Sequence, residues 1–394
     1  MRYKLVAYRR SEDIPPRREK DLFHSTALFK VYEQTSGYHP ILIEVSDGDL
    51  PLARLLAVVR RSVRLFPPSI IKRCEVYGFG EYYFAESADG VRSTDGKERD
   101  DDAPEAEGAL KTDDVPEAEG ALKTDDAPRS NENTRFYENI GSDEDPKLES
   151  GATPYSKEEI FHQMLTFLTR RMLRRCFLIE FRNLDNALFA YNSFRQCGYF
   201  PINWLRIHNS LHSKPPYDRL SASRRRQITQ ALRSGATIAT AETEEEVRTL
   251  GRLLRRHYTS QIRKHFPGLS FFPQLLRQQA ERETGKIFVV KYKGRIIGGS
   301  VCLYSGDNAY LLFSGGLRKS HPKQYPGVLA VWAALTYAYD HGYHHMEFMD
   351  VGLPFKRHGY RDFLLRFGGA QYSTRRWFRF RWSWLNRLLT YFYI

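Results

Sequence analysis

Three short apolar segments separated by two tight turns constrain the fold of this chain more than any other feature. Residues 286–292 (KIFVVKY), 295–304 (RIIGGSVCLY) and 309–314 (AYLLFS) are rich in β-branched and aromatic residues and are separated by only two and four residues. This spacing predicts an antiparallel meander. A basic loop, an apolar helix at 328–339 and a strand at 345–351 follow, so we predict a mixed α/β unit.

The first part of the chain repeats this organisation. The turn signal Asp47-Gly48-Asp49 separates two apolar segments, and Ser156-Lys157-Glu158-Glu159 reads as a helix start. The predicted strands here are residues 39–45, 51–63, 75–84, 176–182 and 199–207, and the predicted helices are residues 21–35, 156–174 and 185–197. We therefore predict a first unit formed by residues 1–86 plus 154–213.

The second predicted unit spans residues 214–394 and contains the meander. Before the meander, the pattern predicts helices at residues 220–233, 243–263 and 273–282 and a short strand at 236–241. Glu244, Glu245 and Glu246 stand in the first turns of the second of these helices, where carboxylates complement the helix dipole.

An acidic repeat interrupts the first unit. The segment DDAPEAEGALKT at residues 101–112 returns as DDVPEAEGALKT at residues 113–124, with a period of twelve residues. The repeat is too short, too acidic and too poor in large apolar residues to build a solenoid. We therefore predict that residues 87–153 form a disordered insertion. An acidic mimic of nucleic acid that folds over a basic cleft is the alternative interpretation.

The charge of the chain is strongly divided. Residues 95–147 contain 18 acidic and 7 basic residues, a net charge of −11, so the remainder carries +24 although the formal total is +13. The chain outside residues 95–147 is basic enough to attract polyanions such as tRNA, coenzyme phosphates, nucleotide-sugar phosphates or anionic lipid. Basic residues that only solubilise the surface are the alternative.

Other global features narrow the class. The chain has no run of about 18 apolar residues that would predict a membrane span, and its first residues lack the apolar region of a signal peptide. Its four cysteines are far apart and fit neither a disulfide framework nor a metal site: Cys74, Cys176, Cys197 and Cys302. We expect a reduced, cytoplasmic protein that binds no metal.

Several motifs near the end of the second unit resemble those of a known protein family. Phe348-Met349-Asp350-Val351-Gly352, then Gly359-Tyr360-Arg361-Asp362-Phe363 and Arg366-Phe367-Gly368-Gly369, resemble the closing motifs of FemAB-like proteins, and the element order resembles the GNAT acyltransferase core. The resemblance implies an α/β (α+β mixed sheet) fold of two tandem GNAT-like units. It also implies an acyltransferase that uses acyl-CoA or aminoacyl-tRNA as donor. Its acceptor would be the amine of a small molecule or of a cell-wall (peptidoglycan) precursor.

The donor site is expected around the start of the apolar helix. GNAT proteins commonly hold pyrophosphate with Gln or Arg, then Gly, then Gly or Ala at a helix N-terminus, and Gln324 and Gly327 match two of these positions whereas Leu329 departs from the third. A helix start preceded by a solvated basic loop is the alternative. The predicted donor-binding residues are Leu312, Gly315, Arg318, Lys323, Gln324 and Gly327.

The predicted catalytic residues are Asp350, Tyr360 and Arg366. Asp350 ends an apolar strand where its carboxylate could accept the proton of an amine. Glu347 is the alternative acid, and the odd separation places the two on opposite faces of a strand. The resemblance would place a lysine at Leu364, so either Arg366, Lys356 or Arg361 replaces its charge or the protein lacks the step that the lysine serves.

The basic, aromatic tail has two interpretations. Residues 375–394 (RRWFRFRWSWLNRLLTYFYI) contain five arginines and no acidic residue. We expect a last strand, with Phe378, Phe380 and Trp382 facing the core, followed by a short packed helix. The alternative is a peripheral contact with the inner face of a membrane. A non-catalytic protein that binds polyanions or membranes on a GNAT-like fold also remains open.

Overall fold

The computed structural model describes residues 3–65, 68–84, 155–184, 187–258, 266–281, 284–349, 351–356 and 358–393. All of these residues belong to one compact unit. The predicted insertion at 87–153 and the predicted base Asp350 therefore lie outside the described residues.

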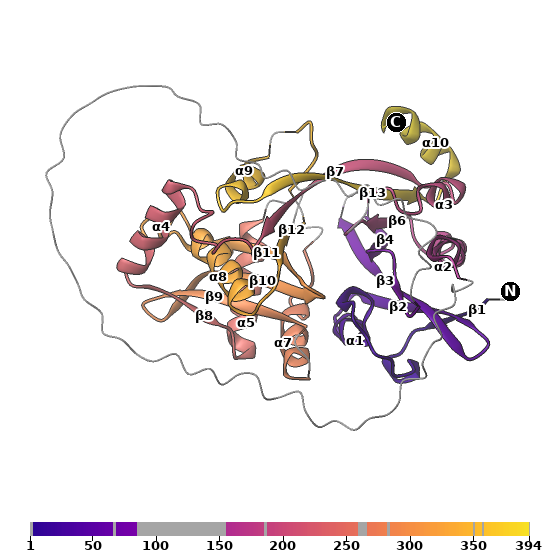
Figure 1. The fold of residues 1–394 in the computed structure, drawn as a ribbon, viewed down its shortest axis with the longest axis horizontal. Helices are drawn as coiled ribbons and strands as arrows, with labels where there is room; N and C mark the ends of the chain where they lie inside the picture. The colour runs from indigo at the N-terminus through magenta and orange to yellow at the C-terminus, as the bar shows by residue number, and fades with distance from the viewer. Residues whose placement is uncertain are drawn as a thin grey trace, which may run out of the picture. The chain divides into compact units, whose positions relative to one another are not determined.

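A mixed sheet of 13 strands is the framework of this unit (Figure 1). Its order is β1-β2-β3-β4-β6-β13-β7-β12-β11-β10-β9-β8, and β5 pairs with β3 beside this path. The strands are β1 (Lys4–Tyr8), β2 (Tyr38–Asp47), β3 (Leu50–Leu65), β4 (Pro68–Tyr77), β5 (Glu81–Tyr82), β6 (Leu178–Arg182), β7 (Phe200–Ser210), β8 (Ala236–Thr240), β9 (Gly285–Tyr292), β10 (Arg295–Ser305), β11 (Asn308–Gly316), β12 (His345–Phe348) and β13 (Ala370–Phe380).

Helices cover both faces of this sheet. They begin at residues that suit helix starts: Thr243 and Glu246 form a capping box, and Pro326 stands in the first turn of its helix. The α-helices are α1 (Thr26–Glu33), α2 (Lys157–Leu173), α3 (Tyr191–Gln196), α4 (Ala222–Arg233), α5 (Glu244–His257), α7 (Phe271–Glu281), α8 (Pro326–Asp340), α9 (Gly359–Leu365) and α10 (Ser383–Tyr393), and two short 3-10 helices lie at Ser11–Asp13 and Leu22–His24.

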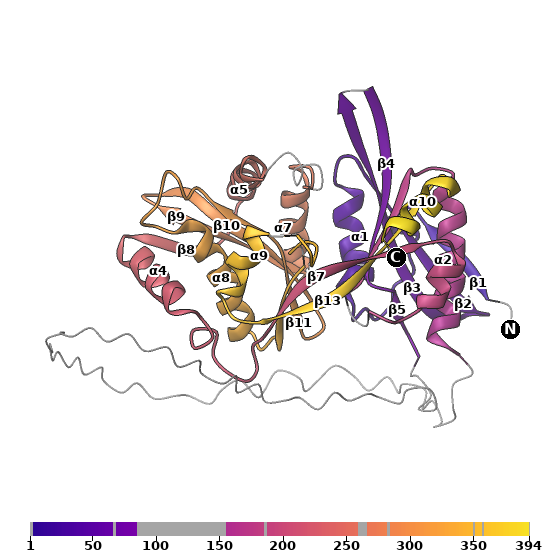
Figure 2. The ribbon, with the colours of Figure 1, turned by 90° about the horizontal axis from the view of Figure 1, so that it is seen from above.

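Three apolar clusters hold the layers together. The first joins α1, α5 and α7 to the sheet, and the second packs α4, α8 and α9 against the strands around β10 and β11. The third lies between α2, α3 and the strands around β3. Figure 2 shows α5 and α8 on opposite sides of β10. The meander β9–β10–β11 is thus buried on both faces, which explains its nearly continuous apolar sequence.

The last strand joins the two halves of the chain. β13 pairs antiparallel with β6 from Arg376 to Phe380 and with β7 from Ala370 to Phe378, while β7 also pairs with β12. Strands from both predicted units therefore share one sheet. The proposed boundary between residues 213 and 214 stays a prediction.

The tail prediction was wrong about which face is buried. Trp377 is fully buried and stacks on Phe194, whereas Trp382 lies beyond the strand and is half exposed. The cause is the third apolar cluster, which covers the sheet face that carries Trp377. Other differences are small: the strand predicted at 75–84 is β4 followed by β5, and the strand predicted at 345–351 already ends at Phe348.

We predict that replacing residues 87–153 by a Gly/Ser linker of roughly eight residues preserves the fold. The rings of Phe84 and Tyr155 lie 5.7 Å apart, so a short linker can join the two ends. Loop-closure entropy grows with the logarithm of length, so the free energy of unfolding should rise by up to about 2 kcal/mol. Denaturant unfolding followed by circular dichroism measures this, and a non-cooperative transition would contradict the prediction.

Candidate active site

Two neighbouring strands part in the middle of the sheet. β11 pairs with β10 as far as Gly316, but it pairs with β12 only from Asn308 to Leu311. Beyond Leu311 one edge of β11 has no strand partner in the part of the chain that the structure describes. At Ser314 the backbone N–H donates to the hydroxyl of Tyr258 (3.2 Å), and that hydroxyl donates to the Ser314 carbonyl (3.0 Å). These backbone groups therefore face the opening, where an extended chain could pair with them.

The start of α8 presses against the sheet beside this open edge. A Cβ atom on Gly316 would lie 2.7 Å from the amide nitrogen of Gly327 and 2.7 Å from the Cβ of Pro326. A Cβ on Gly298 would lie 2.9 Å from the carbonyl oxygen of Gly315. Glycine at these positions lets the N-terminus of α8, with its amides and positive dipole end, reach the opening.

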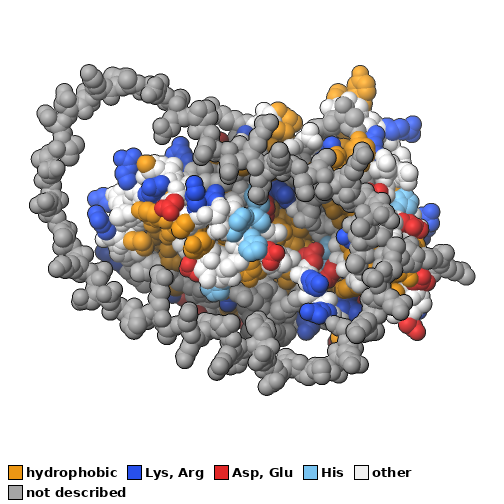
Figure 3. Space-filling view, viewed as in Figure 1, with side chains coloured by type: hydrophobic (Ala, Val, Ile, Leu, Met, Phe, Trp, Pro, Cys, Tyr) orange, Lys and Arg blue, Asp and Glu red, His pale blue; other side chains and the backbone are white. Residues whose placement is uncertain are grey.

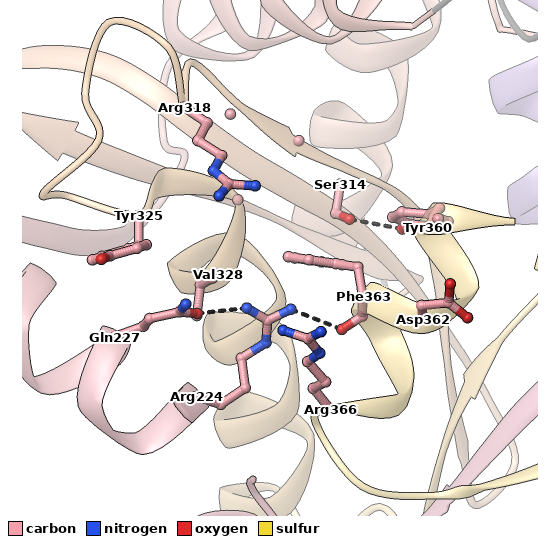
Figure 4. Close-up of a pocket in the computed structure, with 14 residues that line it drawn as sticks. Arg224, Gln227, Ser314, Arg318, Tyr325, Val328, Tyr360, Asp362, Phe363 and Arg366 are labelled. Atoms are coloured by element: carbon pink, nitrogen blue, oxygen red, sulfur yellow. Dashed lines mark hydrogen bonds between the residues drawn. The ribbon is translucent and has the colours of Figure 1, made fainter. Parts of the chain in front are cut away.

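A cavity of about 360 Å³ fills the space between these elements (Figure 4). Ser314, Gly315 and Gly316 of β11 line one side, and Tyr325, Gly327 and Val328 at the start of α8 line another. The remaining wall comes from Arg224 and Gln227 of α4, from Arg318, and from α9 with Gly359, Tyr360, Asp362, Phe363 and Arg366.

The cavity wall is strongly positive. Arg224, Arg318 and Arg366 line it, and none of the three forms an ion pair with a described Asp or Glu. In Figure 4 the guanidinium groups of Arg224 and Arg366 lie next to each other, and the carboxylate of Asp362 points away from them. Three guanidinium groups without an ion-pair partner among the described residues, beside a helix N-terminus, are an arrangement that suits an anion such as a phosphate.

Arg224 is the most constrained of these cations. Its side chain is buried, donates to the Gln227 side chain (2.5 Å) and to the carbonyl of Phe363 (2.9 Å), and stacks on the rings of Phe363 and Phe367. Its buried Nε has no hydrogen-bond partner among the described residues. Burial, together with the charges of Arg366 and Arg318, lowers the pKa of Arg224 to about 10. A positive charge is thus held without a counter-charge.

Two hydroxyl groups meet at the entrance to the parted strands. The Ser314 Oγ and the Tyr360 hydroxyl oxygen lie 2.8 Å apart. The Ser314 backbone also bonds Tyr258, so the hydroxyl groups of two tyrosines converge on one residue of the open edge. Tyr360 can therefore present a proton to an atom held against β11.

The structure places some predicted site residues in this cavity and others elsewhere. Gly315, Arg318, Gly327, Tyr360 and Arg366 line it. Leu312, Lys323 and Gln324 are not among the lining residues: Leu312 packs on the first apolar cluster, Gln324 is buried and Lys323 faces solvent. Asp350 follows β12 by two positions and lies outside the described residues.

Glu347 and Leu364, which were also considered from the sequence, lie outside the cavity. Glu347, the alternative acid, is buried outside the cavity, where it contacts Nδ1 of His208 and lies 3.7 Å from the Nε of Arg206. Leu364 is fully buried in the second apolar cluster, so at this position the chain has a core residue in place of a charged one.

Four residues of the site were not predicted from the sequence: Arg224, Gln227, Ser314 and Tyr258. For Arg224 a signal was present: it shares a helix face with Ile228 and Ala231, at spacings of four and seven residues, and all three are buried. An arginine on the apolar face of an amphipathic helix indicates a structural or functional role. Ser314 and Tyr258 meet only through the fold and left no local signal.

Among the described residues, no group of three or more His, Cys, Asp or Glu side chains could hold a metal ion. No helix in the described ranges is both long and apolar enough to cross a membrane.

We predict that Gly316→Ala lowers the free energy of unfolding by about 1–3 kcal/mol, because the new methyl group would overlap the backbone of Gly327. The control is Gly359→Ala, since a Cβ on Gly359 would meet no atom within 4 Å. Thermal unfolding of both variants checks this. Equal stability of the two variants would show that α8 does not press on the sheet.

The comparisons with known proteins agree with this architecture. The family model described as "Acetyltransferase (GNAT) domain" matches residues 222–357. The chain is similar in structure to FemX, with a TM-score of 0.53 and 11% identity over 94% of each chain. It is also similar to a tandem GNAT protein from the clavulanic acid biosynthesis pathway, with a TM-score of 0.51 and 10% identity over 97% of this chain and 99% of that one.

A search of curated protein sequences found no match. At the identities of the two structural neighbours, the likeness concerns the fold alone. The expected family resemblance and fold class are nevertheless confirmed, since a domain model and two full-length structures lead to the same architecture. Residues 222–357 match the model of a GNAT acetyltransferase domain, and the chain has the FemAB-like fold of two tandem GNAT units.

Proposed function

We propose that this protein is an N-acyltransferase that moves an acyl group from a phosphate-bearing activated donor to an amine. The observation that carries the proposal is the cavity in which the open edge of β11, the start of α8 and three unpaired arginines meet. Phosphate groups would bind at the helix start and the arginines, and the reactive end of the donor would lie along β11. The GNAT domain at residues 222–357 supports the same reaction class.

Of the two donor classes, acyl-CoA fits this site better than aminoacyl-tRNA. A volume of about 360 Å³ is that of a small-molecule pocket. The amide groups of a pantetheine arm can pair with backbone groups at a strand edge. We propose that they would replace the Tyr258 hydroxyl as partners of the Ser314 N–H and C=O. The tandem GNAT protein is itself described in a state without AcCoA. The strong positive charge outside the insertion favours tRNA as the second candidate.

The chemistry needs positioning more than special side chains. The amine nitrogen attacks the acyl carbon, and a C–N bond forms while the C–S bond to coenzyme A breaks. The amine gives up a proton to a base, for which we propose Asp350, and the departing thiolate takes a proton from the Tyr360 hydroxyl. Arg366 would stabilise negative charge on the donor. No metal takes part in this scheme.

The acceptor would be an amine of a small molecule or of a cell-envelope precursor, as the family resemblance implies. We further propose that the reaction takes place in the cytoplasm, where acyl-CoA is available. A screen that follows thermal stability and acyl transfer with acyl-CoAs, charged tRNA and nucleotide-linked cell-wall precursors tests these classes together. Donor binding without transfer to any amine would instead favour the non-catalytic alternative.

We predict that Gly327→Asp abolishes binding of coenzyme A, whereas Gly327→Ala preserves it. A Cβ atom at this position meets only the Gly316 amide nitrogen at 3.9 Å, so a methyl group fits. The aspartate adds a negative charge where phosphate oxygens would bind. Isothermal titration calorimetry of both variants separates charge from bulk, and equal affinity of the two would refute the phosphate assignment.

We predict that Arg224→Met weakens coenzyme A binding at least about tenfold, while it changes the free energy of unfolding by no more than about 1 kcal/mol. The pKa of about 10 lies below the ordinary value, so the charged guanidinium destabilises the folded state. This cost is fully present below pH 10 and is relieved as the pH rises further. Methionine removes both this cost and the stabilising hydrogen bonds of the arginine, so the two effects on the free energy of unfolding largely cancel.

The matched control is Arg226→Met on the solvent face of α4, which should change neither quantity. Calorimetric titration and chemical unfolding of both variants at neutral pH provide the two readouts. If Arg224→Met unfolds the protein or binds coenzyme A normally, Arg224 is a structural residue and no part of the donor site.

We predict that Asp350→Asn slows single-turnover acyl transfer about 100-fold or more and leaves coenzyme A affinity unchanged, since it removes a base and keeps the size of the side chain. Tyr360→Phe should slow transfer less and also spare affinity, because it removes one proton donor near the leaving group. Rapid-quench measurement of the first turnover gives the transfer rate of each variant. Transfer at the wild-type rate in Asp350→Asn would exclude this residue as the base.

A further inference from the structure

The C-terminal helix is attached to the sheet by a polar side chain. Asn386 is buried, and its amide nitrogen donates to the carbonyl of Phe380 (2.8 Å) while its Oδ1 accepts from the Phe380 N–H (2.8 Å). α10 packs against β7 and β13 on this side. The two hydrogen bonds fix which face of α10 points toward the sheet.

The opposite face of α10 is apolar and exposed. Trp384, Leu388, Tyr391 and Phe392 follow one another at helical spacing, and their exposed fractions are 60%, 47%, 84% and 69%. Trp382, just before the helix, is 50% exposed and stacks on Trp384. A surface helix normally buries its apolar stripe and exposes its polar residues. Here a stripe of large apolar residues stays exposed although Asn386 is buried on the other side, which indicates an interaction surface.

Exposed arginines belong to the segment that carries this stripe. Arg381 comes just before α10 and Arg387 lies within it, and both are exposed, as are Arg174 and Arg175 after the last turn of α2. The Arg381 N–H donates to the carbonyl of Phe177 (2.9 Å), and the rings of Phe177 and Trp382 lie 5.3 Å apart, so the end of α2 is next to the start of α10. In Figure 3, orange side chains protrude at the upper right, where Figure 1 places α10, beside blue ones.

We propose that α10 and Trp382 dock the protein onto the surface of an anionic phospholipid bilayer. Tryptophan and tyrosine have apolar bodies and polar tips that suit the boundary between headgroups and acyl chains. The arginines would bind lipid phosphates, and a helix lying in the plane of the interface would bury its stripe among the acyl chains.

The charge pattern favours lipid over a second copy of the chain. Residues 375–394 contain no acidic residue. A symmetric dimer through this stripe would therefore bring Arg381 and Arg387 of two copies together without counter-charges, which is unfavourable. An anionic bilayer supplies both the apolar layer and the negative charge. The surface lies outside the donor cavity, so this proposal stands independently of the proposed reaction.

Vesicle co-sedimentation of the full chain tests the proposal. The wild type should bind phosphatidylcholine vesicles that contain phosphatidylglycerol, bind pure phosphatidylcholine vesicles much more weakly, and lose affinity as salt is raised. The double variant Trp384→Ser/Tyr391→Ser should bind at least about tenfold more weakly. Tryptophan fluorescence of the wild type should shift to shorter wavelength on the anionic vesicles only.

Two further variants keep the test independent of folding. Arg381→Gln/Arg387→Gln retains the stripe and should lose most of the preference for anionic vesicles, and Leu188→Ser, which changes an exposed leucine outside α10, should bind as the wild type does. Equal binding to neutral and anionic vesicles, or full vesicle binding by the Trp384→Ser/Tyr391→Ser variant, would overturn the proposal. So would a wild-type dimer in sedimentation velocity that this variant abolishes.

Discussion

The candidate active site depends on the parting of two strands. Within the described ranges β11 and β12 pair only over Asn308–Leu311, and β11 then continues along β10 alone. A sheet buried on both faces normally pairs its backbone groups, because an unpaired buried N–H or C=O costs free energy. In this structure the hydroxyl of Tyr258 forms hydrogen bonds with the N–H and the C=O of Ser314. A donor chain that paired with the same groups would exchange one set of hydrogen bonds for another.

The second constraint is that positive charge accumulates where the strands part. Gly316 lets the start of α8 reach the opening, and Arg224, Arg318 and Arg366 surround the same space. Arg224 is held there by two hydrogen bonds and two aromatic rings in place of a carboxylate. Burying the charged Arg224 guanidinium costs free energy, which its lowered pKa reflects. Such a cation is expected at a site where the ligand supplies the missing negative charge.

Local patterns predicted the elements of the fold better than the contacts between them. The meander at β9–β11 and the start of α8 follow from turns, β-branched residues and Pro326, all of which act within a few residues. The pairing of β13 with β6 joins residues almost 200 positions apart, and no local pattern encodes it. The buried face of the tail was therefore assigned wrongly, because the cluster that covers Trp377 is formed by distant helices.

The same distinction applies to the site. Gly315, Arg318, Gly327, Tyr360 and Arg366 were predicted from short motifs, and they line one cavity. Arg224 comes from a helix about 90 positions before α8 and joins them only through the fold. A crystal structure of the complex with coenzyme A would show whether this cavity is the donor site. We expect the pyrophosphate at the Gly327 amide with Arg224, Arg318 or Arg366 in contact, and the pantetheine arm along β11. Coenzyme A bound elsewhere, with this cavity empty, would contradict the proposed donor site.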